Sequence, residues 1–204
     1  MKAIGISGSP RAKGNTEYLV DFVLSKLSAK GVDTELITLS DKSIAPCKAC
    51  YHCVKEKGCS TKDDFQAIFA KMCSADALVI GSPVHHAGIA GKLKGLLDRT
   101  GFVSRWIGSE MKRADENYQW KGTALSRKIL APITVARRTG HTFALAQLLL
   151  WGTVNDLIIV SADYWPMALA GTAGAVDAES DREGLTIMEH LADNIYFLLE
   201  KLQK

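Results

Sequence analysis

The chain has 204 residues, of which 47% are hydrophobic and 23% are charged, and its formal net charge is +3. A chain of this length buries enough apolar surface to fold as one domain without disulfide bonds. The ordinary composition excludes a disordered or collagen-like chain. Because the few excess positive charges form no basic stripe, a nucleic-acid partner is also excluded.

Short apolar strand-like segments alternate with segments whose apolar residues recur at helical spacing. In chain order we predict a strand at 2–7, a helix at 15–29, a strand at 34–39, a helix at 62–73, a strand at 77–82, a helix at 88–100, a strand at 129–136, a helix at 141–151, a strand at 156–161 and a helix at 180–202. Such alternation predicts an α/β fold in which a five-stranded parallel sheet is covered by helices on both faces.

Two features depart from this regular alternation. Pro132 lies inside a predicted strand, where it cannot donate a hydrogen bond to its neighbour. Residues 102–127 hold Trp106, Tyr118 and Trp120 among charged residues, and we predict an insertion or lid there. These aromatic residues form either a flap or oligomer contact, or a small satellite core. The whole chain, 1–204, is predicted to be one domain.

The N-terminus lacks the pattern of a signal peptide, because Arg11 and Lys13 follow a very short apolar run. The longest apolar runs, such as 143–151, are shorter than a bilayer span, so no membrane association is predicted. We therefore expect a cytoplasmic protein whose thiols stay reduced, which argues against disulfide bonds.

Ligands of doubly wound α/β folds bind beyond the carboxyl ends of the strands, at the switch point in strand order. The segment 7–16 follows the first strand and leads into a helix. Its hydroxyl, amide and guanidinium groups suit a phosphate, although a plain turn with a helix cap is the alternative. The groups are Ser7, Ser9, Arg11, Asn15 and Thr16. The segment has neither the dinucleotide fingerprint nor a P-loop lysine.

Two further segments are predicted at the same edge of the sheet. His85 and His86 lie in 81–88 and either touch the edge of a flat ligand or are ordinary loop histidines. In 136–141, Gly140 permits close approach of the backbone, and Arg137 either faces a developing anion or lies in a solvated loop. One phosphate pocket with two neighbouring loops suits FMN.

Four of the five cysteines have the spacing C-x2-C-x2-C-x5-C, at Cys47, Cys50, Cys53 and Cys59. Structural zinc prefers two separated C-x2-C pairs, whereas successive C-x2-C steps with a fourth cysteine nearby are typical of iron–sulfur ligation. Iron–sulfur, zinc and metal-free interpretations remain open at this point. Cys73 stands apart on the apolar face of a predicted helix and is interpreted as a small buried residue.

The blocks GISGSPR, ADALVIGSPV and LKGLLDR resemble the flavodoxin-like, NADPH-dependent FMN reductase superfamily. Within it, the four-cysteine loop at 47–59 resembles that of the iron–sulfur flavoprotein family. The resemblance spans nearly the whole chain except 102–127. It implies a flavodoxin-like three-layer sandwich that holds FMN and a [4Fe–4S] cluster in a homodimer or homotetramer. Some members of the superfamily keep several of these cysteines without a metal.

The resemblance also implies roles for individual residues. The FMN-binding residues would be Ser7, Ser9, Pro10, Arg11, Asn15, Thr16, Pro83, Val84, His85, His86, Ala136, Arg137 and Gly140. The cluster ligands would be Cys47, Cys50, Cys53 and Cys59. Two departures concern the flavin potential and the acceptor: His85 stands where the superfamily often has Tyr, and the loop ARRTGH is less glycine-rich than usual.

We therefore predict an FMN-dependent oxidoreductase with no dedicated catalytic side chain. Electrons from a donor such as ferredoxin would pass through the cluster to FMN and on to dioxygen, peroxide, a quinone or a similar acceptor. The first alternative is a clusterless FMN or quinone reductase that uses NAD(P)H. The second is a non-enzymatic carrier of the flavodoxin type, which the slightly basic charge disfavours.

Overall fold

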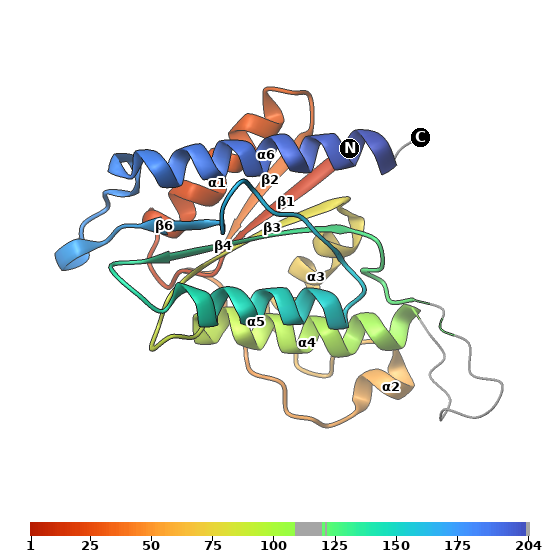
Figure 1. Cartoon of the computed structure of the whole chain (residues 1–204). Helices are drawn as coiled ribbons and strands as arrows, with labels where there is room; N and C mark the ends of the chain where they lie inside the picture. The colour runs from red at the N-terminus through yellow and green to blue at the C-terminus, as the bar shows by residue number, and fades with distance from the viewer. Residues whose placement is uncertain (109–119, 121, 203–204) are drawn as a thin grey trace.

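The computed structural model describes residues 1–108, 120 and 122–202. Within these residues a parallel sheet forms the middle layer of the molecule (Figure 1), and its strands run in the order β2-β1-β3-β4-β5, with β6 paired to β4. The strands are β1 (Lys2–Ser7), β2 (Asp33–Thr38), β3 (Ala77–Pro83), β4 (Ile129–Ala136), β5 (Ile158–Ile159) and β6 (Met167–Leu169). This is the flavodoxin-like order, whose switch point lies between β1 and β3.

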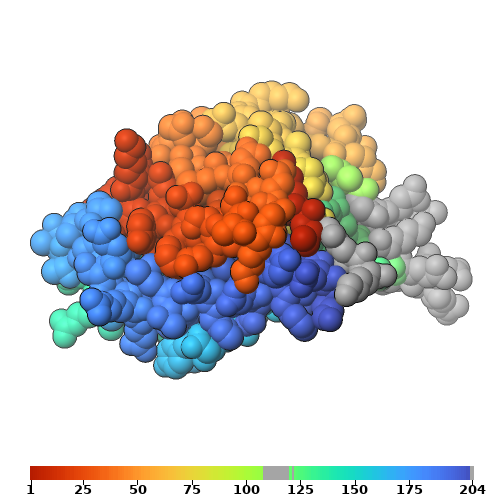
Figure 2. Space-filling model, turned by 90° about the horizontal axis from the view of Figure 1, so that it is seen from above, coloured from red at the N-terminus to blue at the C-terminus, as the bar shows by residue number. Residues whose placement is uncertain are grey.

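Helices cover both faces of the sheet, as predicted. Figure 1 shows α1 (Asn15–Ser28) and α6 (Arg182–Leu202) on one face of the sheet. On the other face lie α3 (Phe65–Ser74), α4 (Gly91–Gly108) and α5 (His141–Val154). Figure 2 shows α6 beside the N-terminal part of the chain across the first of these faces. The α/β three-layer fold is therefore confirmed.

The apolar spacing of the sequence explains this packing. On α1, Leu19 and Val23 are fully buried, and Leu191 and Ile195 of α6 pack into the same cluster. The central strands β1, β3 and β4 are buried on both faces, which accounts for their continuous apolar sequences.

Pro132 is compatible with a central strand because the hydrogen bond that it cannot donate would point to a place where no strand among the described residues is paired. The Leu130 carbonyl accepts from the Val160 N–H, and the Thr134 N–H donates to the Pro166 carbonyl, both at 3.0 Å. The backbone N–H and C=O groups of the even-numbered residues of β4 therefore point toward β5 and β6. The absent N–H of Pro132 would face the gap between β5 and β6, where the chain leaves the sheet. The same gap explains why β5 is shorter than the predicted strand at 156–161.

Other boundaries differ from the sequence prediction. The insertion predicted at 102–127 starts too early, because α4 continues to Gly108 and carries Trp106. The second predicted helix starts at Phe65 rather than at 62, because the preceding Asp63 and Asp64 accept backbone hydrogen bonds from Ala45 and Ser43. Tyr118 lies outside the described residues, and Trp120 is 46% exposed.

A short helix, α2 (His52–Glu56), lies within the cysteine loop and was not predicted. No helix among the described residues is both long and apolar enough to cross a membrane.

Candidate flavin and cluster sites

The loop between β1 and α1 is organised by its own hydroxyl and backbone groups. The Gly8 N–H donates to the Gly81 carbonyl at 2.8 Å, and the Ser9 hydroxyl accepts from the Arg11 N–H at 3.0 Å. Ser7, Ser9 and Thr16 are all buried. The Ser7 hydroxyl makes no hydrogen bond within the described part of the chain. Buried hydroxyls at the start of a 14-residue helix form the kind of site that binds phosphate.

The three segments predicted from the sequence enclose one pocket of about 200 Å³. Ten of the predicted residues line it: Ser9, Pro10, Arg11, Asn15, Thr16, Pro83, Val84, His85, Ala136 and Arg137. Ala170 and Gly171, which follow β6, line it too; these two residues were not predicted, because no sequence pattern indicates β6. The pocket therefore lies at the carboxyl edge of β1, β3 and β4, where the fold places a mononucleotide.

The side chain of Asn15 is engaged by the segment after β6. Its Nδ2 donates to the Ala175 carbonyl at 3.0 Å, and its Oδ1 accepts from the N–H groups of Asp177 and Ala178 at 2.8 and 3.0 Å. Arg11 also reaches this segment through the Gly174 carbonyl, at 3.3 Å. Asn15 therefore anchors one wall of the pocket in this structure.

Three predicted residues, Ser7, His86 and Gly140, do not line the pocket. Ser7 ends β1 just behind it, and His86 lies at the exposed tip of the turn after β3 with a φ of +48°. Gly140 has a φ of +94°, and a Cβ there would lie 2.9 Å from Val84 Cγ1. Gly140 thus allows the loop after β4 to pack against a wall residue of the pocket.

The cysteine loop leaves the carboxyl end of β2, passes α4 and reaches α2 on the outer side of that helix (Figure 1). Its backbone adopts positive φ angles at three residues that are not glycine: Ala49, Tyr51 and Lys57. Such conformations cost free energy and cluster at functional sites. The backbone of this loop is therefore held in a specific conformation by its contacts, unlike that of a simple connecting loop.

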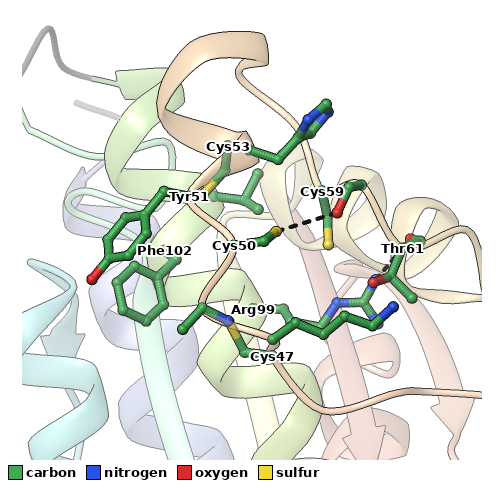
Figure 3. A pocket seen from close by; sticks show the side chains of 13 residues that line it. Cys47, Cys50, Tyr51, Cys53, Cys59, Thr61, Arg99 and Phe102 are labelled. Carbon is green, nitrogen blue, oxygen red and sulfur yellow. Dashed lines mark hydrogen bonds between the residues drawn. The ribbon is translucent and has the colours of Figure 1, made fainter.

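All four cysteines of the loop line a single pocket (Figure 3). None of the five cysteines of the chain is in a disulfide bond. The floor comes from α4, through Arg99, Phe102 and Val103. These three residues were not predicted as site residues, because the predicted helix ends at residue 100 and the LKGLLDR block that contains Arg99 indicates the family but no ligand. Exposed Tyr51 completes the lining beside Phe102.

Two kinds of metal site use four thiolates, and they differ in the spacing of their sulfur atoms. No three His, Cys, Asp or Glu side chains in the described ranges are placed to hold one metal ion. A tetrahedral zinc site would bring its sulfur atoms to about 4 Å from one another, because Zn–S bonds are about 2.3 Å long. A cubane spreads its thiolates more widely, since each binds a separate iron. The four thiols on one pocket are the type and number of ligands that a [4Fe–4S] cluster requires.

The local electrostatics differ between the thiols. The hydrogen bond between Cys50 Sγ and the Ser60 hydroxyl, at 3.4 Å, lowers the pKa of the Cys50 thiol. Burial raises the pKa of the Cys53 thiol. Because the thiolate is the metal-binding form, the lowered pKa favours that form of Cys50, whereas the raised pKa disfavours it for Cys53.

A buried ion pair joins the cysteine loop to α4. Arg99 Nη1 lies 2.6 Å from Asp63 Oδ2, and the two side chains are 1% and 7% exposed. Asp63 also accepts from the N–H groups of Ala45 and Phe65, at 2.9 and 3.1 Å. Burial alone would raise the pKa of the Asp63 carboxyl, but these hydrogen bonds and the charge of Arg99 lower it below its usual value.

We expect Asp63→Asn to destabilise the metal-free protein by about 3 kcal/mol at pH 7, because it leaves the Arg99 charge buried and unpaired. The lowered pKa means that this contribution is present above about pH 4, the ordinary value for an unfolded Asp, and is lost as the pH falls through the folded value. Urea unfolding of both proteins at pH 7 and pH 3 tests this. A deficit of equal size at both pH values would contradict it.

The fold and the pocket at the β1–β3 switch point define a flavodoxin-like, FMN-binding protein. Consistent with this, the structure resembles that of a flavodoxin from the domain Archaea, with a TM-score of 0.60, 15% identity and full coverage of both chains. Residues 1–172 match the family described as NADPH-dependent FMN reductase. The chain belongs to this family and is an FMN-dependent oxidoreductase.

Among curated proteins the chain is similar to two iron–sulfur flavoproteins of Methanocaldococcus jannaschii. One is 32% identical over 208 residues and covers both chains completely; the other is 30% identical over 207 residues and covers 98% of each. The predicted resemblance to the iron–sulfur flavoprotein family is therefore confirmed. The predicted cofactors, FMN and an iron–sulfur cluster, are confirmed at the level of the family.

Proposed function

We propose that the protein binds FMN and a [4Fe–4S] cluster and transfers electrons from a one-electron donor such as ferredoxin, through the cluster and FMN, to an acceptor. The observation that carries this proposal is the single pocket lined by Cys47, Cys50, Cys53 and Cys59, supported from behind by α4. The acceptor would be dioxygen, peroxide, a quinone or another flavin. Free thiols of this kind suit a reducing compartment such as the cytoplasm.

The chain's own residues would bind and orient the flavin. The phosphate would lie at the start of α1, against Ser9, Pro10, Arg11, Asn15 and Thr16, with Ser7 directly behind this loop at the end of β1. The ring would lie along Pro83, Val84, His85, Ala136 and Arg137, and His86 and Gly140 would shape the loops that carry these residues. FMN supplies the redox chemistry, and the cation of Arg137 in the pocket wall would stabilise negative charge on the reduced ring.

The two pockets share no lining residue, and the cysteine loop lies on the outer side of α4 (Figure 1). We therefore propose that electrons cross between subunits of a homodimer or homotetramer. The outer face of α5 supports such an assembly, because Phe143, Leu150 and Val154 are 58–68% exposed on a helix without a charged residue. Exposed apolar clusters of this kind mark interaction surfaces.

We expect Leu150→Glu to weaken self-association at least 100-fold, because burying a carboxylate against an apolar partner costs several kcal/mol. Sedimentation velocity over a concentration series measures this. Phe197→Glu is the matched control, since Phe197 is 55% exposed on α6, in the opposite helical layer. Equal association of the Leu150 variant and the unaltered protein would contradict an interface at α5.

The competing function is a clusterless FMN or quinone reductase that uses NAD(P)H, which the NADPH named in the family description favours. Anaerobic mixing with reduced ferredoxin or with NADPH, followed at the flavin absorbance band, separates the two. We expect ferredoxin to reduce the flavin at least 100-fold faster than NADPH does. Faster reduction by NADPH would contradict the proposal, and reduction without turnover of any acceptor would indicate a simple carrier.

A further inference from the structure

Arg99 contacts both ends of the cysteine loop from a fully buried position. Its Nη1 donates to the Ala45 carbonyl at 3.1 Å, and its Nη2 donates to the Thr61 carbonyl at 3.0 Å. Ala45 precedes Cys47 by two residues, and Thr61 follows Cys59 by two. The segments 45–46 and 60–61 are the two stems of the cysteine loop, and all four cysteines lie between them. One side chain therefore fixes the distance between the two stems.

The guanidinium itself is held in place by its surroundings. It lies 4.2 Å from the centre of the Phe65 ring, and its ion pair with Asp63 ties it to the start of α3. Gly95, one turn earlier on α4, lies under the same stem: a Cβ there would be 3.5 Å from the Ala45 carbonyl oxygen and from Pro46 Cα. The first stem thus rests directly on α4, on a surface formed by Gly95 and Arg99.

The two members of the ion pair differ in their contact with the cysteine pocket. Arg99 lines their pocket, whereas Asp63 does not. Figure 3 shows the Arg99 side chain beside Cys59 and running toward Thr61. The Asp63 carboxylate, which is outside this lining, accepts hydrogen bonds from the backbone N–H groups of Ala45 and Phe65. The positive member of the pair therefore borders the thiol pocket, and the negative member does not.

We propose that Arg99 is a positioning residue of the cluster site that also sets how readily the cluster accepts an electron. Before the cluster is inserted, Arg99 holds the loop in a shape that presents the four thiols to one pocket. Once the cluster is bound, the fixed cation stabilises the form that carries one more electron and hence one more negative charge. No proton moves in this step, because arginine stays protonated. The charge effect rests on the proposed function, whereas the positioning effect does not.

Hydrogen–deuterium exchange on the metal-free protein tests the positioning effect. We expect the amides of residues 45–61 to exchange at least tenfold faster in Arg99→Gln. The paired replacement of Arg99→Met with Asp63→Leu removes both charges without leaving one unpaired, and should also loosen the loop. Lys94→Gln is the control, since Lys94 is on the same helix and pairs with Asp98 outside the pocket. Unchanged exchange in both Arg99 variants would overturn the positioning role.

A redox titration of the reconstituted protein tests the charge effect, with electron paramagnetic resonance as the readout of the cluster. At fixed ambient potential, we expect the ratio of reduced to oxidised cluster to fall about tenfold or more in Arg99→Gln and less in the paired variant. Arg99→Lys keeps the charge and should stay near the ratio of the unaltered protein, even if less iron is bound. The FMN potential should not change.

An equal fall in the lysine and glutamine variants would overturn the charge effect, and so would an unchanged ratio in all of them. If the unaltered protein took up no iron, the proposed function and the charge effect would both fail. The exchange measurement would still decide the positioning role.

Discussion

Replacing Cys53 with serine is expected to reduce bound iron and acid-labile sulfide at least tenfold while FMN binding stays unchanged. Cys53 is carried by α2 and packs partly against the core beneath the loop, so serine fits its place. A serine hydroxyl is not ionised at neutral pH and is a poor substitute for a thiolate ligand. Because the cysteine and flavin pockets share no residue, losing one cofactor should spare the other. Iron, sulfide and flavin assays on one anaerobic preparation measure all three.

Cys73→Ser provides the matched control. Cys73 lies on α3, is partly buried and does not line the cysteine pocket. We expect this variant to keep its full iron content and its ferredoxin-dependent rate, whereas Cys53→Ser should lose that rate at least 100-fold. Equal iron loss in both variants would point to general destabilisation and would contradict a specific ligand role for Cys53.

Placing a carboxylate in the proposed phosphate site should have the largest effect on the flavin. We expect Ser9→Asp to weaken FMN binding about 100-fold or more, since a fixed negative charge next to a phosphate costs about 3 kcal/mol or more at such a site. Ser9 is buried in the loop before α1 and lines the pocket. Fluorescence titration of the flavin-free protein with FMN measures the dissociation constant.

Two controls separate charge from folding in this experiment. Ser9→Ala removes only the hydroxyl that accepts from Arg11, and should weaken FMN binding about tenfold or less. Riboflavin lacks the phosphate, so its affinity should change far less in Ser9→Asp than that of FMN. If riboflavin and FMN lost affinity equally, the phosphate would not lie at this loop.

The sequence predicts the layered fold and most of the residues that line the pocket at the carboxyl edge of the sheet, because those features depend on local patterns. Continuous apolar runs mark buried parallel strands, and hydroxyl-rich turns before helices mark anion sites. Once the strand order is known, the loops after the first, third and fourth strands must meet at one edge. For this reason ten predicted residues line one pocket although they come from three distant segments.

The features that sequence reasoning missed depend on contacts between distant segments. β6 is three residues long and pairs with β4 only beyond Pro132, so it is too short for a periodic sequence pattern to predict it. The sequence suggests that the Asn15 amide is available to a ligand, yet its oxygen accepts a hydrogen bond from the Asp177 N–H. Arg99 lies in a helix whose other basic residues are exposed or partly exposed, and it is buried by the cysteine loop together with Asp63 and the Phe65 ring, which are distant in the sequence.

The measurement that tests the account most directly is the iron and acid-labile sulfide content of protein purified without oxygen, read together with its visible spectrum. We predict about four irons and four sulfides per chain, as expected for one cubane held by four cysteines, with a broad absorbance beside the flavin bands that reductant bleaches. A clean flavin spectrum with neither iron nor sulfide, in protein that keeps its FMN, would contradict the cluster and leave the NAD(P)H-dependent reductase as the function to test.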